Sequence, residues 1–329
     1  MNSLENTIKW YPWLNYQYRN IINSYQQERG HHALLIHSPR GNGVFSMFYA
    51  LSRWLICNKP KGIKSCGQCY SCKLMKANNH PDYYHYESKN SSLSIGIDNI
   101  RNIIEFIHGK PCEGRVKVVL LQHIELMTEQ AANALLKTLE EPPVSTYFIL
   151  GCHDKYRLLP TLISRCLYWK LLTPNEKIGI NWIKKYNNYP ILSLITALRL
   201  CEGAPVNALK FLNSIRWKER IIFCTSMSNV IVSRNFISLL PIINIDKYDG
   251  PLYWLLSLLI DSLKLKYEAK EFLINLDQHK LINDIAESWS YIKRQEMLKN
   301  LFYCLYQLQD LSSGLNRELL IINQLINWN

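Results

Sequence analysis

Four cysteines lie close together in the first quarter of the chain, at a spacing that suits a metal ion. They are Cys57, Cys66, Cys69 and Cys72, out of ten cysteines in 329 residues. Four thiolates so spaced favour a tetrahedral zinc ion, with Zn–S bonds of about 2.3 Å. No histidine or carboxylate interrupts the set, so we predict a closed, structural site. An iron–sulfur cluster or a C-x-x-C redox pair is the alternative.

A second segment has the layout of a phosphate-binding loop without its chemistry. Residues 32–46 read as an aliphatic strand, a turn with two glycines and the start of a helix. When the segment is aligned on Gly43, the lysine that reaches the phosphates is replaced by Val44 and the hydroxyl that binds magnesium by Phe45. The first glycine is replaced by Ser38. Taken alone, the glycines could equally make a simple tight turn.

The second half of an ATPase site is also altered. In ATPases, an acidic pair at the end of another strand holds magnesium and positions the attacking water. Here the strand expected over 116–121 runs into Gln122 and His123. Two separate parts of the chemistry are missing, so we expect this chain neither to bind ATP nor to have intrinsic ATPase activity.

The elements that must position these residues follow an alternating pattern typical of a parallel sheet flanked by helices. Thr128 is the expected N-cap of the last helix in this part, and Pro142 and Pro143 follow its end. We expect strands at 32–36, 82–86, 116–121 and 147–150, and helices at 43–56, 97–108 and 129–140.

Beyond Trp169 the strand pattern fades, and the rest of the chain is rich in Leu and Ile at helical spacing. We therefore expect three domains: an α/β domain over 1–171 with a zinc module at about 57–80, a small helical domain over 172–213, and an all-helical domain over 214–329.

The overall charge and hydropathy restrict the class of protein. The formal net charge is +12, which favours an anionic partner such as nucleic acid or, alternatively, a uniformly solvated basic surface. The twenty tyrosines and nine tryptophans are not interleaved with basic residues as in single-strand platforms. Residues 1–5 lack the pattern of a secretory signal, and the longest apolar stretch, 252–260, is too short to span a bilayer. We expect a cytoplasmic protein.

Several longer strings give the chain a family resemblance. A thirteen-residue string over 131–143 resembles the signature helix of clamp-loader ATPases, and Ser164-Arg165-Cys166 resembles the arginine-finger motif of the same family. Further matching strings lie at 10–14, 30–34 and 314–320. Together they make nearly the whole chain similar to the delta-prime subunits of the bacterial DNA polymerase III clamp loader, within the AAA+ ATPases.

This resemblance implies a RecA-like first domain with zinc, a small helical domain and a helical collar. It implies a subunit that does not hydrolyse ATP and that offers Arg165 to the ATP site of a neighbour; the alternative for Arg165 is a surface ion pair. Cys152 and Val206 occupy places where hydrolysing relatives have sensing residues. Arg101 lies on a helix that lines the DNA chamber in relatives, although a solvated helix face is an equal alternative.

The implied partners are motor subunits and a clamp-opening subunit in a hetero-pentamer and, indirectly, the sliding clamp, the polymerase core and primed DNA. The chain would then be part of a DNA-directed DNA polymerase holoenzyme without being an enzyme alone. Two other classes remain open: a self-sufficient ATPase with an atypical loop, and a stand-alone zinc-containing DNA-binding module.

Overall fold

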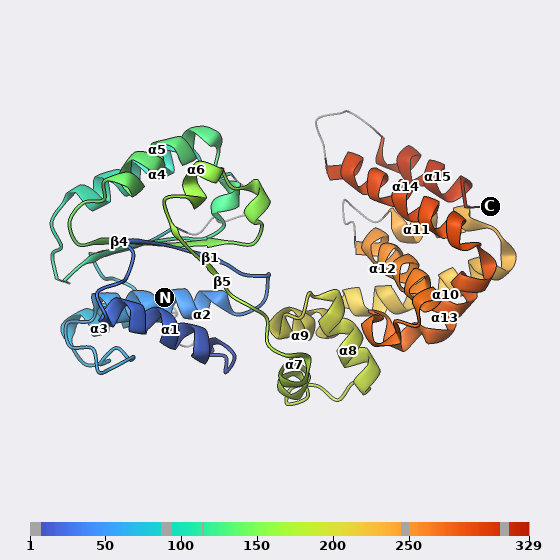
Figure 1. Ribbon diagram of the computed structural model, residues 1–329, viewed down its shortest axis with the longest axis horizontal. Helices are drawn as coiled ribbons and strands as arrows, with labels where there is room; N and C mark the ends of the chain where they lie inside the picture. The colour runs from blue at the N-terminus through green and yellow to red at the C-terminus, as the bar shows by residue number, and fades with distance from the viewer. Residues whose placement is uncertain (1–7, 87–93, 114, 245–249, 310–315, 329) are drawn as a thin grey trace. The chain divides into compact units, whose positions relative to one another are not determined.

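The computed structural model describes residues 8–86, 94–113, 115–244, 250–309 and 316–328. The chain forms two compact units, Met1–Pro174 and Asn175–Asn329 (Figure 1). The strings at 1–5 and at Gly314 and Leu315 fall outside the described residues. Within the described residues, no helix combines the length and apolar character needed to cross a bilayer.

Unit 1 is built on a five-stranded parallel sheet with the strand order β2-β3-β4-β1-β5. Central strands buried on both faces need nearly continuous apolar sequence, and β3 and β4 have it. In the centre of the sheet, Leu35 of β1 lies opposite Leu150 of β4. The strands are β1 (Ala33–His37), β2 (Tyr83–Tyr86), β3 (Lys117–Leu121), β4 (Thr146–Cys152) and β5 (Leu167–Lys170).

Helices cover both faces of this sheet (Figure 1). The alternation of strand side chains divides the core: Leu35 and Val119 contribute to the cluster that includes α4 and α5, whereas Leu34 and Val118 contribute to the cluster that includes α1 and α2. Thr128 caps α5 as predicted, accepting a hydrogen bond from the backbone N–H of Ala131. The helices are α1 (Leu14–Gln26), α2 (Val44–Ile56), α3 (Tyr70–Lys76), α4 (Ile97–His108), α5 (Glu129–Glu140) and α6 (Pro160–Ile163).

The four predicted strands and three predicted helices of this unit are all present. The sequence interpretation missed β5, α1 and the short helices α3 and α6. Because the strands are parallel, their carboxyl ends meet at one edge of the sheet, where such folds hold their ligands.

In the described residues of unit 2, helices are the only regular secondary structure. Two apolar clusters fill it: one formed chiefly by α7, α8 and α9, the other by α10 and the helices that follow. Its helices are α7 (Glu176–Ile183), α8 (Ile191–Leu200), α9 (Pro205–Asn213), α10 (Ile215–Ser233), α11 (Leu240–Ile243), α12 (Gly250–Lys264), α13 (His279–Ser288), α14 (Tyr291–Gln309) and α15 (Arg317–Ile326).

Candidate metal centre and degenerate nucleotide site

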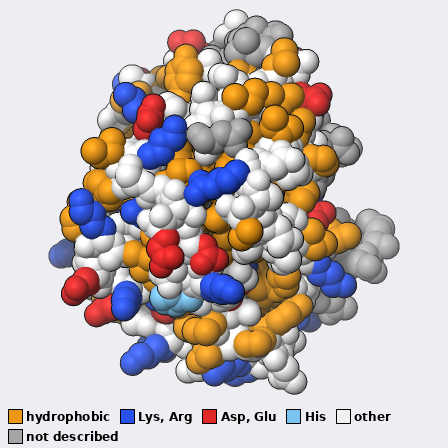
Figure 2. Space-filling view, turned by 90° about the vertical axis from the view of Figure 1, so that its right-hand side faces the viewer, with side chains coloured by type: hydrophobic (Ala, Val, Ile, Leu, Met, Phe, Trp, Pro, Cys, Tyr) orange, Lys and Arg blue, Asp and Glu red, His pale blue; other side chains and the backbone are white. Residues whose placement is uncertain are grey.

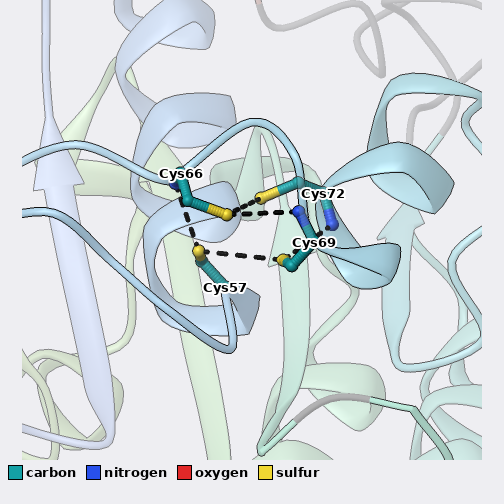
Figure 3. A group of neighbouring side chains, drawn as sticks. All are labelled: Cys57, Cys66, Cys69 and Cys72. Atoms are coloured by element: carbon teal, nitrogen blue, oxygen red, sulfur yellow. Dashed lines mark hydrogen bonds between the residues drawn. The ribbon is translucent and has the colours of Figure 1, made fainter.

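The four clustered cysteines converge in unit 1 (Figure 3). Their sulfur atoms all lie within 4.8 Å of one another. The Sγ atoms of Cys57 and Cys69 are 4.0 Å apart, and those of Cys66 and Cys72 are 3.9 Å apart. A tetrahedron with Zn–S bonds of about 2.3 Å has edges of about 3.8 Å. The group could therefore hold a metal ion such as zinc with little rearrangement.

Two helices and the turn between them bring these cysteines together. Cys57 ends α2, Cys69 caps the start of α3, and Cys72 lies in the first turn of α3. Backbone N–H groups donate to the sulfurs in sequence: Cys66 N to Cys57 Sγ, Cys69 N to Cys66 Sγ, and Cys72 N to Cys69 Sγ, at 3.3–3.4 Å. The turn also needs Gly67, whose φ of +72° is unfavourable for other residues.

The electrostatic surroundings of the cysteines are unequal. Hydrogen bonds from the backbone N–H groups of Cys69 and Gln68 lower the pKa of Cys66 to about 6. Burial, in contrast, raises the pKa of Cys57 and of Cys72. Two of the four thiols therefore hold their protons firmly until a cation replaces them.

The degenerate phosphate loop is covered by the segment that precedes α1. Gly43, the N-cap of α2, has a φ of +78°, and a Cβ atom added there would lie 2.3 Å from the ring of Tyr11. Tyr11 stacks on Trp13, and the indole N–H of Trp13 donates to Asn42 O at 2.9 Å. The hydroxyl of Ser46 donates to Lys9 O at 2.7 Å. Aromatic rings and backbone thus occupy the approach to the loop.

Beside this loop, side chains at or just after the carboxyl ends of β2, β3 and β4 contact one another. Phe45 packs against His85, with 5.5 Å between ring centroids, and Gln122 Nε2 lies 2.8 Å from His85 Nε2. Glu125 Oε1 accepts from His153 N at 3.2 Å and lies 3.7 Å from His123 Nδ1. Gln122 and His123, the two residues in place of the acidic pair, therefore contact neighbouring side chains.

Glu125 is a residue that the sequence interpretation missed. Burial raises the pKa of its carboxyl, but hydrogen bonds from His123 and from the backbone N–H groups of Glu125 and His153 outweigh burial and hold the pKa below its usual value. The side chain is 4% exposed. It lies within the 3-10 turn Ile124–Leu126 that follows β3, so a search for acidic residues directly after the strand does not find it.

Little space remains where the phosphates of a nucleotide would lie. The cavity lined by Val44, Phe48, Gln122 and the residues around Cys152 has a volume of about 10 Å³. A single water molecule needs about 10–15 Å³ measured in this way. The small cavity and the ring of Tyr11 beside Gly43 leave little room at the start of α2.

Arg165 follows α6 on the route to β5. Its guanidinium forms an ion pair with Glu140 at the end of α5, and Nη1 donates to Thr161 O at 2.9 Å. The side chain is 33% exposed. The ion pair considered from the sequence is therefore present in the isolated chain, and action in a neighbouring site requires Arg165 to leave Glu140.

Of the remaining predicted positions, Cys152 lines this small cavity, whereas Val206 and Arg101 do not. Cys152 ends β4, and burial raises its pKa to about 12. Val206 lies in the first turn of α9 in unit 2. Arg101 is exposed on α4 and pairs with Asp98 at 3.0 Å.

Unit 2 exposes large apolar side chains that its own core does not use. On α14, Ile292, Phe302, Tyr303 and Tyr306 are each at least half exposed. Figure 2 shows one face of the molecule on which hydrophobic side chains gather between charged ones. Exposed apolar groups of this size are typical of protein–protein contact surfaces.

Three family models match consecutive parts of the chain. "DNA polymerase III, delta subunit" matches residues 14–175, "DNA polymerase III subunit delta', AAA+ ATPase lid domain" matches residues 174–213, and "DNA polymerase III, delta subunit, C terminal" matches residues 214–329.

Curated relatives match over nearly the full length. The chain is 43% identical to DNA polymerase III subunit delta' of Yersinia pestis, over 98% of this chain and 96% of the relative. It is 37% identical to the subunit of the same name from Buchnera aphidicola subsp. Schizaphis graminum, over 98% and 97%. It is 38% identical to DNA polymerase III subunit delta' of Escherichia coli K12, over 97% of this chain and 95% of the relative.

Proposed function

Because the chain belongs to the family of DNA polymerase III delta-prime subunits, we propose that it serves in the clamp-loader complex as a subunit that does not hydrolyse ATP. In this role it helps to load the sliding clamp on primed DNA. A cytoplasmic location and the three-domain division at 171 and 213 are parts of the same proposal.

The observation that carries the proposal is the filled phosphate loop. Val44 and Phe45 stand in place of the lysine and the hydroxyl, and the cavity beside them has a volume of only about 10 Å³. ATP binding would need space, a cation and a magnesium ligand at this point. The loop therefore acts as a structural connection between β1 and α2.

Arg165 is the residue by which the subunit acts on a neighbour. A guanidinium neutralises the charge on phosphoryl oxygens in the transition state and can be supplied by another chain. Arg165 is partly exposed, and its partner Glu140 is 47% exposed, so the pair is open to solvent and weakly held. A triphosphate presented by a neighbour carries more negative charge than Glu140 and would draw the guanidinium away.

The other parts of the proposal concern assembly. The motor and clamp-opening subunits of a hetero-pentamer are the proposed partners, and the exposed apolar side chains of α14 support a contact surface in the C-terminal region. Zinc bound by the four cysteines would brace the segment between α2 and α3. In this proposal zinc has no catalytic part, because all four ligand positions are taken by sulfur.

The test is a reconstituted clamp loader that contains the Arg165→Ala chain. We expect normal assembly and a fall of ~10²-fold or more in ATP turnover at the adjoining site, because a positioned arginine contributes at least that much to phosphoryl transfer. Arg157→Ala is the matched control, since Arg157 is also an exposed arginine in an ion pair. Unchanged turnover with Arg165→Ala, or ATP hydrolysis by the isolated chain, would contradict the proposal.

A further inference from the structure

A pocket of about 770 Å³ lies in unit 1, between the segment before α1, helices α1 and α2, and the loop that joins Cys57 to Cys66. Its size is that of a small-molecule site. Its wall on α2 includes Ser46 and Tyr49, whereas the filled nucleotide site uses Val44 and Phe48. The pocket and the degenerate loop thus lie along different faces of the same helix.

Three aromatic rings line the pocket: Trp10, Tyr18 and Tyr49. Trp10 meets Tyr18 edge-on, with 5.3 Å between ring centroids, and 41% of Trp10 is exposed. The polar hydrogens of all three side chains are already donated within the chain, from Trp10 to Asn15 Oδ1, from Tyr18 to Ile63 O and from Tyr49 to Met75 O. These rings therefore offer apolar faces to a ligand.

Three cationic side chains surround the rings: Arg19, Arg53 and Lys64. Among the described residues that line the pocket, none is Asp or Glu. Arg53 lies over the ring of Tyr49, 5.7 Å from its centroid, while Arg19 and Lys64 are exposed at the rim. The described side chains around the pocket therefore carry a net positive charge, which favours an anionic ligand.

We propose that this pocket binds a nucleotide unit, with the base on the exposed face of Trp10 and the phosphate among Arg19, Arg53 and Lys64. A nucleotide joins a planar aromatic group and an anion in one small unit, which matches the stacking and charge offered here. A peptide would need backbone hydrogen-bond partners, and the indole and hydroxyl donors of the three rings are already used. The unit can come from a free nucleotide or from a DNA single strand.

This inference does not depend on the proposed function, because neither Arg165 nor the phosphate loop takes part. The sequence alone does not predict such a site. Tyr18 and Arg19 are adjacent in the chain, but Trp10, Arg53 and Lys64 come from separate segments. Only the folded unit brings the aromatic and basic side chains together.

The test uses isothermal titration calorimetry of the full chain, at low and moderate salt. The probes are thymidine 5′-monophosphate, the oligonucleotide (dT)12 and inorganic phosphate. We expect both thymidine probes to bind more tightly than phosphate. Tighter binding of (dT)12 than of the mononucleotide identifies a strand site, and equal binding identifies a free-nucleotide site.

Three variants locate the binding. Trp10→Ala should weaken binding by about fivefold or more, the usual effect of losing one stacked base. Arg19→Glu and Lys64→Glu should also weaken binding, and more strongly at low salt than at high salt, because they remove phosphate contacts. These two side chains are exposed, so their variants test the site even if Trp10→Ala unfolds the segment before α1.

Lys110→Glu, an equal charge change at an exposed position after α4, is the control and should bind like the unaltered chain. The proposal is overturned if the unaltered chain binds neither thymidine probe, if phosphate binds as tightly as the mononucleotide, or if Arg19→Glu and Lys64→Glu bind like Lys110→Glu.

Discussion

The four clustered cysteines begin from different protonation states before any metal ion binds. Cys66, with a pKa lowered to about 6 by backbone N–H groups, is already largely a thiolate at neutral pH. Burial keeps Cys57 and Cys72 protonated at that pH. A metal ion must displace these protons, so binding is coupled to pH.

The first prediction is that zinc affinity rises steeply with pH. A thiol with a raised pKa releases one proton when it binds zinc, and two such thiols make the affinity rise by at least about two powers of ten per pH unit between pH 7 and pH 8. Cys66 adds little in this window, because its pKa lies below it. Competition with a chromophoric chelator at a series of pH values measures the slope.

Cys66→Ser should release the metal ion, whereas Cys112→Ser, at an exposed cysteine outside the cluster, should retain it. A zinc affinity that does not change between pH 7 and pH 8 would show that the thiols are not protonated as described. Iron with visible absorbance, or purified protein without metal, would exclude the zinc assignment itself.

The residue scale also shows what the sequence can and cannot predict about a site. The cysteine group was predictable because its four ligands lie within sixteen consecutive residues, 57–72, so local spacing limits their geometry. The pairing of Arg165 with Glu140 was not, since its partners come from different elements. The contacts that Gln122 and His123 make at the sheet edge likewise depend on how separate strand ends meet.

At the scale of elements, the junction of β1 and α2 is shaped by one glycine and one aromatic ring. The second prediction is that Gly43→Ala destabilises the protein by about 2–4 kcal/mol. Part of this comes from the left-handed φ of +78°, which costs a non-glycine residue about 1 kcal/mol. The larger part comes from the clash between the new Cβ and the ring of Tyr11, as in other overpacked sites. Urea unfolding measures the loss.

Gly67→Ala is the matched control for that experiment. Gly67 has a similar φ of +72°, but a Cβ there would meet nothing within 4 Å. It should therefore cost only the backbone share, about 1 kcal/mol, in zinc-saturated protein. Equal losses at Gly43 and Gly67 would mean that the ring of Tyr11 moves aside freely and does not hold the loop.

The elements that the sequence interpretation missed have physical reasons for being missed. β5, Leu167–Lys170, is a short edge strand whose two end residues are exposed, so it lacks the buried aliphatic run of β3. α1 has no side-chain cap at Trp13, and it contains many polar residues. Its signal was nevertheless present, because Leu14, Tyr18 and Ile21 recur at helical spacing and are all buried.

At the scale of the whole molecule, a buried polar network fastens unit 2 together. Arg220 of α10 is fully buried, and its guanidinium bonds to both carboxylate oxygens of Asp277 at 2.7 and 2.9 Å and to Asn275 Oδ1 at 2.8 Å. Asp277 N in turn donates to Thr196 of α8. A second arginine, Arg199 of α8, bonds to the backbone of the segment before α13. Helix α8 of the small helical region (α7–α9) is therefore joined by hydrogen bonds to the segment before α13, and that segment is joined to α10.

The third prediction is that the chain unfolds in two calorimetric transitions, one for each compact unit, and that Arg220→Met lowers only the transition of unit 2. Removing one partner of a buried ion pair leaves Asp277 charged and unpaired, at a cost of about 3–5 kcal/mol. Chelation of the metal ion should lower only the transition of unit 1, because all four cysteines belong to it.

Arg216→Met separates loss of the network from loss of a charge on the same helix. Arg216 also lies on α10 and pairs with Glu219, but its side chain is 37% exposed, and exposed pairs contribute at most about 1 kcal/mol. A shift of both transitions by Arg220→Met would mean that the two units unfold as one. A third transition that separates α7–α9 from the later helices would mean that Arg199 and Arg220 do not couple them. A shift of the unit 2 transition alone, larger for Arg220→Met than for Arg216→Met, fits a molecule in which the metal ion braces one unit and the buried arginine the other.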